Sequence, residues 1–138
     1  MKAKQYLLQI DYYDKRITNK LSELAQWRAL ASSTGSQTDG ERVQTSPKDR
    51  LSTVVSKIID LDREIDSLID EYAEKKQEII RTIESIENPN YYDLLFKVYI
   101  EHKFLHEAAA EMHYSYTRIR HMHKEALSAV GTIINSTQ

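Results

Sequence analysis

The residues best suited to chemistry lie in one short run near the C-terminus. From Met112 to Lys124 the sequence carries three cationic side chains, from arginine and lysine, and no acidic one. Arginine can donate two parallel hydrogen bonds to the edge of a guanine, and both cations pair with phosphate groups. The run therefore predicts a surface that binds nucleic acid, although an ordinary solvated basic helix face has a similar composition.

The spacing of the run predicts which side chains face outward. If Ile119 points inward and each residue turns the helix by about 100°, Arg118 lies on a flank and Arg120 points outward. We therefore expect Arg118 to reach a phosphate and Arg120 to reach a guanine edge. Ser115 is a helix cap that can also hold a phosphate together with the neighbouring amides. The candidate DNA contacts are Ser115, Tyr116, Thr117, Arg118, Arg120, His121 and Lys124.

Two short helices joined by a tight turn must position this run. One helix is expected from Leu105 to Met112, and a second begins after the Ser115 cap. Ala109 is small where the two helices would cross, and this spacing is that of a helix-turn-helix. His113 stands where a positive φ is expected, a conformation that glycine adopts more easily. The alternative is a plain helical hairpin with small residues at its crossing.

A further helix is expected immediately upstream. Asn88 is a capping residue, and Pro89 suits the first helical position because its missing N–H needs no partner there. The helix would include Tyr91 to Glu101, with its inward side chains spaced for a core. Those side chains are Leu94, Leu95, Val98 and Tyr99. Residues 88–138 are thus predicted to form a small helix-turn-helix domain that binds DNA.

Residues 46–87 are predicted to form one long helix. Ser46, Pro47 and Asp49 make a capping sequence, and apolar side chains then recur at alternating steps of three and four residues. This is the pattern of a heptad seam, which cannot bury itself and must pack on the N-terminal helix, on a second copy, or on both. The seam positions are Leu51, Val54, Ile58, Leu61, Ile65, Leu68, Tyr72, Lys75, Ile79, Thr82 and Ile86.

The N-terminal part is predicted to be an amphipathic helix over residues 1–31. Its apolar stripe comprises Tyr6, Ile10, Tyr13, Ile17, Leu21, Leu24 and Ala31. Residues 32–45 are polar and hold two of the three glycines, which predicts a flexible surface loop. Residues 1–87 are therefore expected to form a helical hairpin or coiled coil through which the chain self-associates, a dimer being favoured.

The composition favours an all-α protein. The 138 residues include only three glycines and two prolines, so turns are too few for an all-β fold. No cysteine is present, which excludes disulfides and thiolate chemistry and fits a reducing cytoplasm. We expect no signal peptide and no membrane span. The net charge of −2 points away from nucleic acid, but residues 88–138 carry five basic and five acidic side chains, and only the run from Met112 to Lys124 is locally positive.

Enzymatic and metal chemistry are not expected. The five histidines follow residue 101, and no three of them converge at a spacing that zinc sites use. The chain has no glycine-rich phosphate loop, and no nucleophile has an evident base partner. The carboxylates of residues 60–78 are dispersed along the long helix, as on a solvated face. We therefore expect no catalytic residue, no metal and no cofactor.

The run from Phe104 to Leu127 resembles the promoter-reading C-terminal domain of bacterial sigma factors. Ser115 to Leu127, with Arg118-Ile119-Arg120 and Ala126-Leu127, carries most of this likeness. Over nearly the whole chain the layout is similar to the RinA and ArpU group of phage late-gene transcription regulators from Gram-positive hosts. That group has an N-terminal helix, a polar loop, a long helix and a C-terminal helix-turn-helix.

The resemblance implies a phage or prophage regulator in the host bacterial cytoplasm. It would bind double-stranded promoter DNA and activate late genes for packaging and morphogenesis, through a contact with host RNA polymerase. The chain has no room for the other sigma-factor domains, so sigma activity itself is not expected. Two alternatives remain: a coiled-coil adaptor or anti-regulator that binds a protein partner, and a DNA-recognition subunit for genome packaging.

Overall fold

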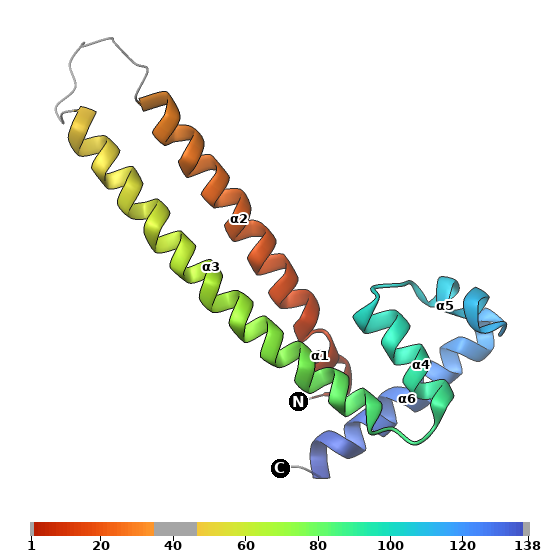
Figure 1. The fold of residues 1–138 in the computed structure, drawn as a ribbon. Helices are drawn as coiled ribbons and strands as arrows, with labels where there is room; N and C mark the ends of the chain where they lie inside the picture. The colour runs from red at the N-terminus through yellow and green to blue at the C-terminus, as the bar shows by residue number, and fades with distance from the viewer. Residues whose placement is uncertain (1, 35–46, 137–138) are drawn as a thin grey trace. The chain divides into compact units, whose positions relative to one another are not determined.

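The computed structural model describes residues 2–34 and 47–136, and every element in them is helical (Figure 1). This confirms the predicted all-α fold. The elements are α1 (Ala3–Leu7), α2 (Gln9–Thr34), α3 (Pro47–Glu84), α4 (Pro89–Leu95), the π-helical segment η1 (Phe96–Ile100), α5 (Leu105–Met112) and α6 (Tyr116–Ser136). None of the helices in the described ranges is long and apolar enough to cross a membrane.

The chain divides into two compact units. We call Tyr13–Glu71 the hairpin unit, and Met1–Tyr12 together with Tyr72–Gln138 the bundle unit. This division differs from the expected boundary between residues 87 and 88. The reason is that the last third of α3 is part of the bundle core, where Ile79 and Ile83 are fully buried.

In the hairpin unit, parts of α2 and α3 run side by side in opposite directions (Figure 1). Leu24, Leu61 and Ile65 form a buried cluster, against which Trp27 and Ile58 pack. Two ion pairs flank it: Lys20 Nζ lies 2.9 Å from Glu64 Oε2, and Arg28 Nη2 lies 3.6 Å from Asp62 Oδ1. The predicted apolar seam is confirmed at the positions that are buried. These are Val54, Leu61, Ile65, Leu68 and Ile79 of α3, and Ile86 just after it.

Several local predictions for this part of the chain were wrong. The N-terminal helix is broken at Leu8, and Leu21 of the predicted stripe is 49% exposed. Leu51 is also exposed, and α3 ends at Glu84 rather than at residue 87. Of the predicted loop, residues 32–34 belong to α2, whereas 35–45 and the capping residue Ser46 lie outside the described residues. Helix α3 does begin at Pro47, as predicted.

The core of the bundle unit joins elements from both ends of the chain. Side chains from α1, α2, α3, α4, η1 and α6 make up one buried cluster, which includes Leu7, Ile10, Ile79, Ile83, Leu95 and Val130. Thr82, which interrupts the apolar seam, has a partner there: its Oγ1 lies 2.9 Å from the Tyr6 hydroxyl. Tyr6 also donates a 2.9 Å hydrogen bond to Glu78 Oε2. These contacts hold α1 against α3.

The helix that precedes the helix-turn-helix begins as predicted. The Asn88 side chain accepts a 2.9 Å hydrogen bond from the Asn90 N–H, and Pro89 is the first helical residue. After Leu95 the helix widens to a π-helix, which Glu101 closes by donating its N–H to the Phe96 carbonyl at 3.0 Å. The sequence pattern did not predict this widening, because π-helical turns have no clear sequence signal.

Candidate nucleic-acid interface

The turn between α5 and α6 has the geometry of a helix-turn-helix. His113 adopts a left-handed conformation with φ 61° and ψ 38°. Its N–H donates to the Ala110 carbonyl at 3.3 Å, and the Tyr114 N–H donates to the Ala109 carbonyl at 3.0 Å. These two bonds make a Schellman motif, which satisfies the last carbonyls of α5 and ends it sharply. The expected positive φ at His113 is therefore confirmed.

The start of α6 is capped by a side chain. Ser115 Oγ accepts a 3.1 Å hydrogen bond from the Arg118 N–H, as the capping prediction required. The Ser115 carbonyl accepts from the Ile119 N–H at 3.0 Å. The first turn of α6 also carries no acidic residue. This end of α6 therefore presents backbone amides and the positive end of the helix dipole, with no carboxylate in its first turn.

A small apolar cluster fixes the angle between α5 and α6. Ala108 and Ala109 of α5 pack with Ile119 and Met122 of α6, and Leu94 of α4 completes the cluster. Ile119, Ala108 and Leu94 have no exposed surface. Because alanine adds only one methyl group, the two helices can approach closely at this point. Ile119 thus points inward, as the helical spacing assumed, and Met122 is buried beside it.

All seven candidate contact residues lie on the surface. Ser115 through Arg118, Arg120, His121 and Lys124 are each exposed, and Tyr116 keeps 51% of its surface accessible. The guanidinium groups of Arg118 and Arg120 lie over the rings of Tyr114 and Tyr116, at 5.6 Å and 5.9 Å from the ring centroids. These aromatic contacts restrict the two arginines without neutralising them.

The three cations on this face of α6 differ from Lys103, which precedes α5, in whether they form ion pairs. Within the described ranges, no carboxylate lies within ion-pair distance of Arg118, Arg120 or Lys124. By contrast, Lys103, just before α5, lies 2.7 Å from Glu111 and 3.2 Å from Glu101. The charges on α6 are therefore available to an anionic ligand, and binding need not first break an ion pair.

Beside these cations the surface has a hollow of about 400 Å³. Its lining includes Ser115, Thr117, Arg118, His121, Met122 and Glu125. Glu125 directly follows the acid-free run and was not among the residues predicted for the interface. Its carboxylate accepts a 2.6 Å hydrogen bond from the Tyr91 hydroxyl, and this bond raises the pKa of Tyr91. Position 125 lies one heptad after Arg118, which is the signal that could have placed it on the same flank.

A second tyrosine supports α6 from the inner side. The Tyr99 hydroxyl lies 2.8 Å from His123 Nε2, and the two rings stack at 5.8 Å. Burial raises the pKa of Tyr99 to about 12, with a smaller contribution from the charge of Asp11. Burial also lowers the pKa of His123, helped by the positive charge of Lys4. Both groups are therefore neutral near pH 7, and they join η1 to the middle of α6.

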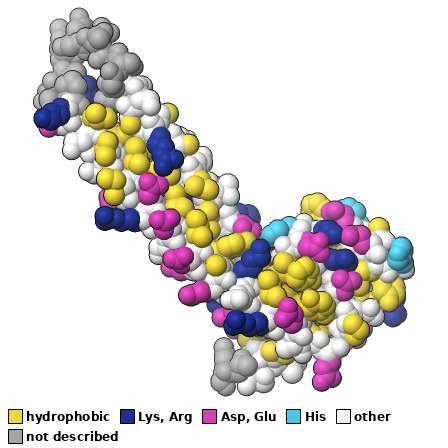
Figure 2. Space-filling model, viewed as in Figure 1, with side chains coloured by type: hydrophobic (Ala, Val, Ile, Leu, Met, Phe, Trp, Pro, Cys, Tyr) yellow, Lys and Arg dark blue, Asp and Glu magenta, His cyan; other side chains and the backbone are white. Residues whose placement is uncertain are grey.

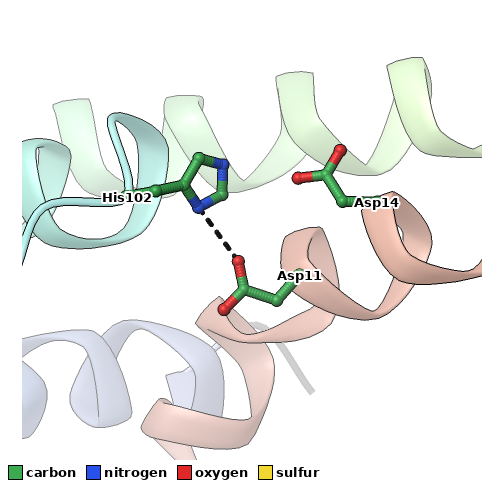
Figure 3. A group of neighbouring side chains, drawn as sticks. All are labelled: Asp11, Asp14 and His102. Carbon is green, nitrogen blue, oxygen red and sulfur yellow. Dashed lines mark ion pairs between the residues drawn. The ribbon is translucent and has the colours of Figure 1, made fainter. Parts of the chain in front are cut away.

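The connection before α5 is tied to the N-terminal helices. His102 has a positive φ of 59°, and its Nδ1 lies 3.0 Å from Asp11 Oδ1 (Figure 3). Asp14, also drawn there, belongs to the hairpin unit. The contact between His102 and Asp11 holds the segment between η1 and α5, and with it the start of the helix-turn-helix. Neither the positive φ nor this partner was predicted from the sequence, because both depend on tertiary contacts.

The fold and this surface define a helical protein with an exposed helix-turn-helix. The chain belongs to the DUF1492 family, described as proteins of unknown function, whose profile matches residues 30–131. The matched range includes α4, α5 and the exposed N-terminal half of α6. No curated protein and no solved structure matches the chain.

Proposed function

We propose that this protein is a sequence-specific regulator that binds double-stranded DNA with the first half of α6. The observation that carries the proposal is the exposure of Arg118, Arg120 and Lys124, unpaired among the described residues, on a helix held by a Schellman turn. A helix in this position of a helix-turn-helix enters the major groove and presents its N-terminal residues to base edges. Arg120 would read a guanine, and Arg118 would bind a phosphate.

The remaining polar side chains of the face suit the rim of such an interface. Tyr116, Thr117, His121 and Lys124 would add base or phosphate contacts, and Ser115 with its neighbouring amides would hold a phosphate. Glu125 limits this surface on one flank, where its carboxylate repels a phosphate placed too far along the helix. The hydrogen bond from Tyr91 keeps that carboxylate in place. The overall charge of −2 does not oppose binding, because the positive side chains are local.

The biological role follows from the resemblance of the sequence to phage regulators. The protein would bind promoter DNA in the host bacterial cytoplasm and activate late genes through a contact with host RNA polymerase. A homodimer would double the readout and favour a target with two half-sites. No cofactor, metal or catalytic step is part of this proposal.

The test is DNA binding by purified full-length protein. A pool of random duplexes, selected by repeated binding at low salt, would give the preferred sequence. On that duplex, replacing Arg120→Ala and Lys124→Ala together is expected to weaken binding by roughly ten- to hundredfold, because a base contact and a phosphate contact are lost. Lys15→Ala with Arg81→Ala is the matched control, since it removes the same charge from exposed positions elsewhere.

Two results would contradict DNA binding through this face of α6, and a third would contradict its sequence specificity. One is the absence of binding to any duplex at low salt, which would leave a protein-binding adaptor as the better explanation. The other is an equal loss of affinity in the test pair and the control pair, which would show that only net charge matters. If the selected pool shows no preferred sequence, binding is general and the readout assigned to Arg120 is wrong.

A further inference from the structure

Helix α3 has a second stripe, with two exposed aliphatic residues at its centre, that lies outside the buried cluster of the hairpin. The stripe follows steps of four, three, four, three and four residues, which keep its members on one face of a helix. Its positions are Lys48, Ser52, Val55, Ile59, Asp62 and Asp66. At about 100° per residue, this face lies roughly a third of a turn from the seam formed by Val54, Leu61 and Ile65.

The two central residues of this stripe are aliphatic and accessible. Val55 is 42% exposed and Ile59 is 47% exposed, although the neighbouring seam residues Val54 and Leu61 are buried. Hydrophobic side chains are also visible along the surface of the hairpin in Figure 2. The two ends of the stripe carry opposite charges, with a lysine at the N-terminal end and two aspartates at the C-terminal end.

We propose that this stripe binds the same stripe of a second copy of the chain, with the two α3 helices antiparallel. A two-fold axis near residue 57 places Val55 of each copy opposite Ile59 of the other. In the same register Lys48 lies opposite Asp66, and Ser52 lies opposite Asp62. Each copy therefore contributes two apolar contacts, two ion pairs are formed across the dimer, and a hydroxyl can donate to each Asp62 carboxylate.

The order of charges selects this orientation. A parallel, in-register pair would place Lys48 opposite Lys48, and Asp66 opposite Asp66, so every charged position would face its own sign. Like charges brought together at an interface are costly, whereas the antiparallel register pairs opposite signs at both ends. Asp62 Oδ1 also lies 3.6 Å from Arg28 Nη2 of its own chain, and this ion pair compensates the charge of Asp62 within the proposed interface.

The interface uses no residue of the candidate DNA surface, so it stands or fails separately from DNA binding. The stripe from residue 48 to 66 extends about 27 Å at 1.5 Å per residue. With two aliphatic residues from each copy at its centre, the contact is expected to be weak to moderate and to form at micromolar concentrations.

The test is the mass of the full-length protein by sedimentation velocity over a concentration series. Wild type is expected to dimerise, and Lys48→Glu or Asp66→Lys alone is expected to weaken dimerisation about tenfold or more, because like charges then face each other twice. An equimolar mixture of the two variants restores one native and one reversed ion pair, so it should dimerise better than either variant alone. The double variant should recover the wild-type affinity.

Several outcomes would overturn the proposal. A monomeric wild type at tens of micromolar excludes the interface. If both single variants dimerise like wild type, the dimer uses another surface. If the mixture stays monomeric while wild type dimerises, the antiparallel register is wrong. The two substituted residues, Lys48 and Asp66, are both exposed. Helicity measured by circular dichroism on each variant controls for loss of the fold.

Discussion

The two units of this chain place their apolar side chains in different ways. The bundle unit buries a continuous cluster from α1, α2, α3, α4, η1 and α6, and its exposed large apolar residues are mostly aromatic. The hairpin unit has a compact cluster around Leu24, Leu61 and Ile65. Its exposed large apolar residues are all aliphatic: Leu21, Leu30, Leu51, Val55, Ile59 and Ile69. The bundle unit thus has the larger buried core, whereas the described part of the hairpin unit leaves more aliphatic side chains exposed.

The polar contacts show a related difference. In the bundle unit, tyrosine hydroxyls of Tyr6, Tyr91 and Tyr99 are hydrogen-bonded to side chains that are distant in sequence. In the hairpin unit, the connecting polar contacts are surface ion pairs such as Lys20 with Glu64. Exposed ion pairs contribute little to stability, whereas hydrogen bonds from the half-buried rings of Tyr6 and Tyr91 and the buried ring of Tyr99 favour one arrangement. These hydrogen bonds therefore specify the geometry of the bundle unit more tightly than surface ion pairs would.

The largest expected difference between the units is the response to removal of an isoleucine side chain. Ile79→Ala in the bundle core should lower the free energy of unfolding by about 2–5 kcal/mol, because Ile79 is fully buried and its loss leaves a cavity. The matched variant Ile59→Ala on the same helix should change it by about 0.5 kcal/mol or less under monomeric conditions. Urea denaturation of both variants at low protein concentration measures the difference. Equal losses would show that the two units are stabilised alike.

A smaller effect is expected at the turn of the helix-turn-helix. His113 has a positive φ, so His113→Gly should raise the free energy of unfolding by up to about 1 kcal/mol, partly offset by the freedom that glycine adds to the unfolded chain. His113→Val should lower it by about 1–2 kcal/mol, since a β-branched residue tolerates this conformation poorly. His106→Val, in the regular part of α5, is the control and should cost less. The opposite ranking of the two valine variants would contradict the observed turn.

The smallest predicted effect is on pH dependence, through Tyr99 and His123. Burial lowers the pKa of His123, so as the pH falls below about 6.5 the unfolded chain takes up a proton that the folded chain does not. The free energy of unfolding should therefore decrease on acidification from that pH. Burial raises the pKa of Tyr99, so stability should also decrease as the pH rises above about 10.

Denaturation of wild type and two variants from acid to alkaline pH checks this prediction. The difference between wild type and His123→Gln isolates the acid side, and the difference between wild type and Tyr99→Phe isolates the alkaline side. If the stability of His123→Gln follows that of wild type at acid pH, His123 does not contribute to the pH dependence. The same holds for Tyr99 if Tyr99→Phe follows wild type at alkaline pH. The hairpin unit contains neither group, which ties both effects to the bundle unit.

The sequence predicted much of this architecture where local rules decide it. The Asn88 cap with Pro89, the extent of α5, the positive φ of His113 and the Ser115 cap were all predicted, because each depends on residues within one turn. The break at Leu8 was not predicted, and neither was the π-helical η1, because π-helical turns have no clear sequence signal. The contact of His102 with Asp11 was missed because it joins segments that are distant in the sequence. In the candidate interface, helical spacing predicted the exposed residues but not Glu125. The carboxylate of Glu125 is held in the surface hollow by a hydrogen bond from the Tyr91 hydroxyl.

The measurement that tests the central proposal most directly is the salt dependence of DNA affinity. Fluorescence anisotropy with the selected duplex would be recorded over a salt series for wild type and for Lys124→Ala. We predict that affinity falls steeply as salt rises, and that Lys124→Ala reduces the slope of log K against log salt by about one unit, because one phosphate contact is lost. An absence of binding at the lowest salt, or an unchanged slope in the Lys124→Ala variant together with unchanged affinity, would contradict the assignment of this face of α6 to DNA.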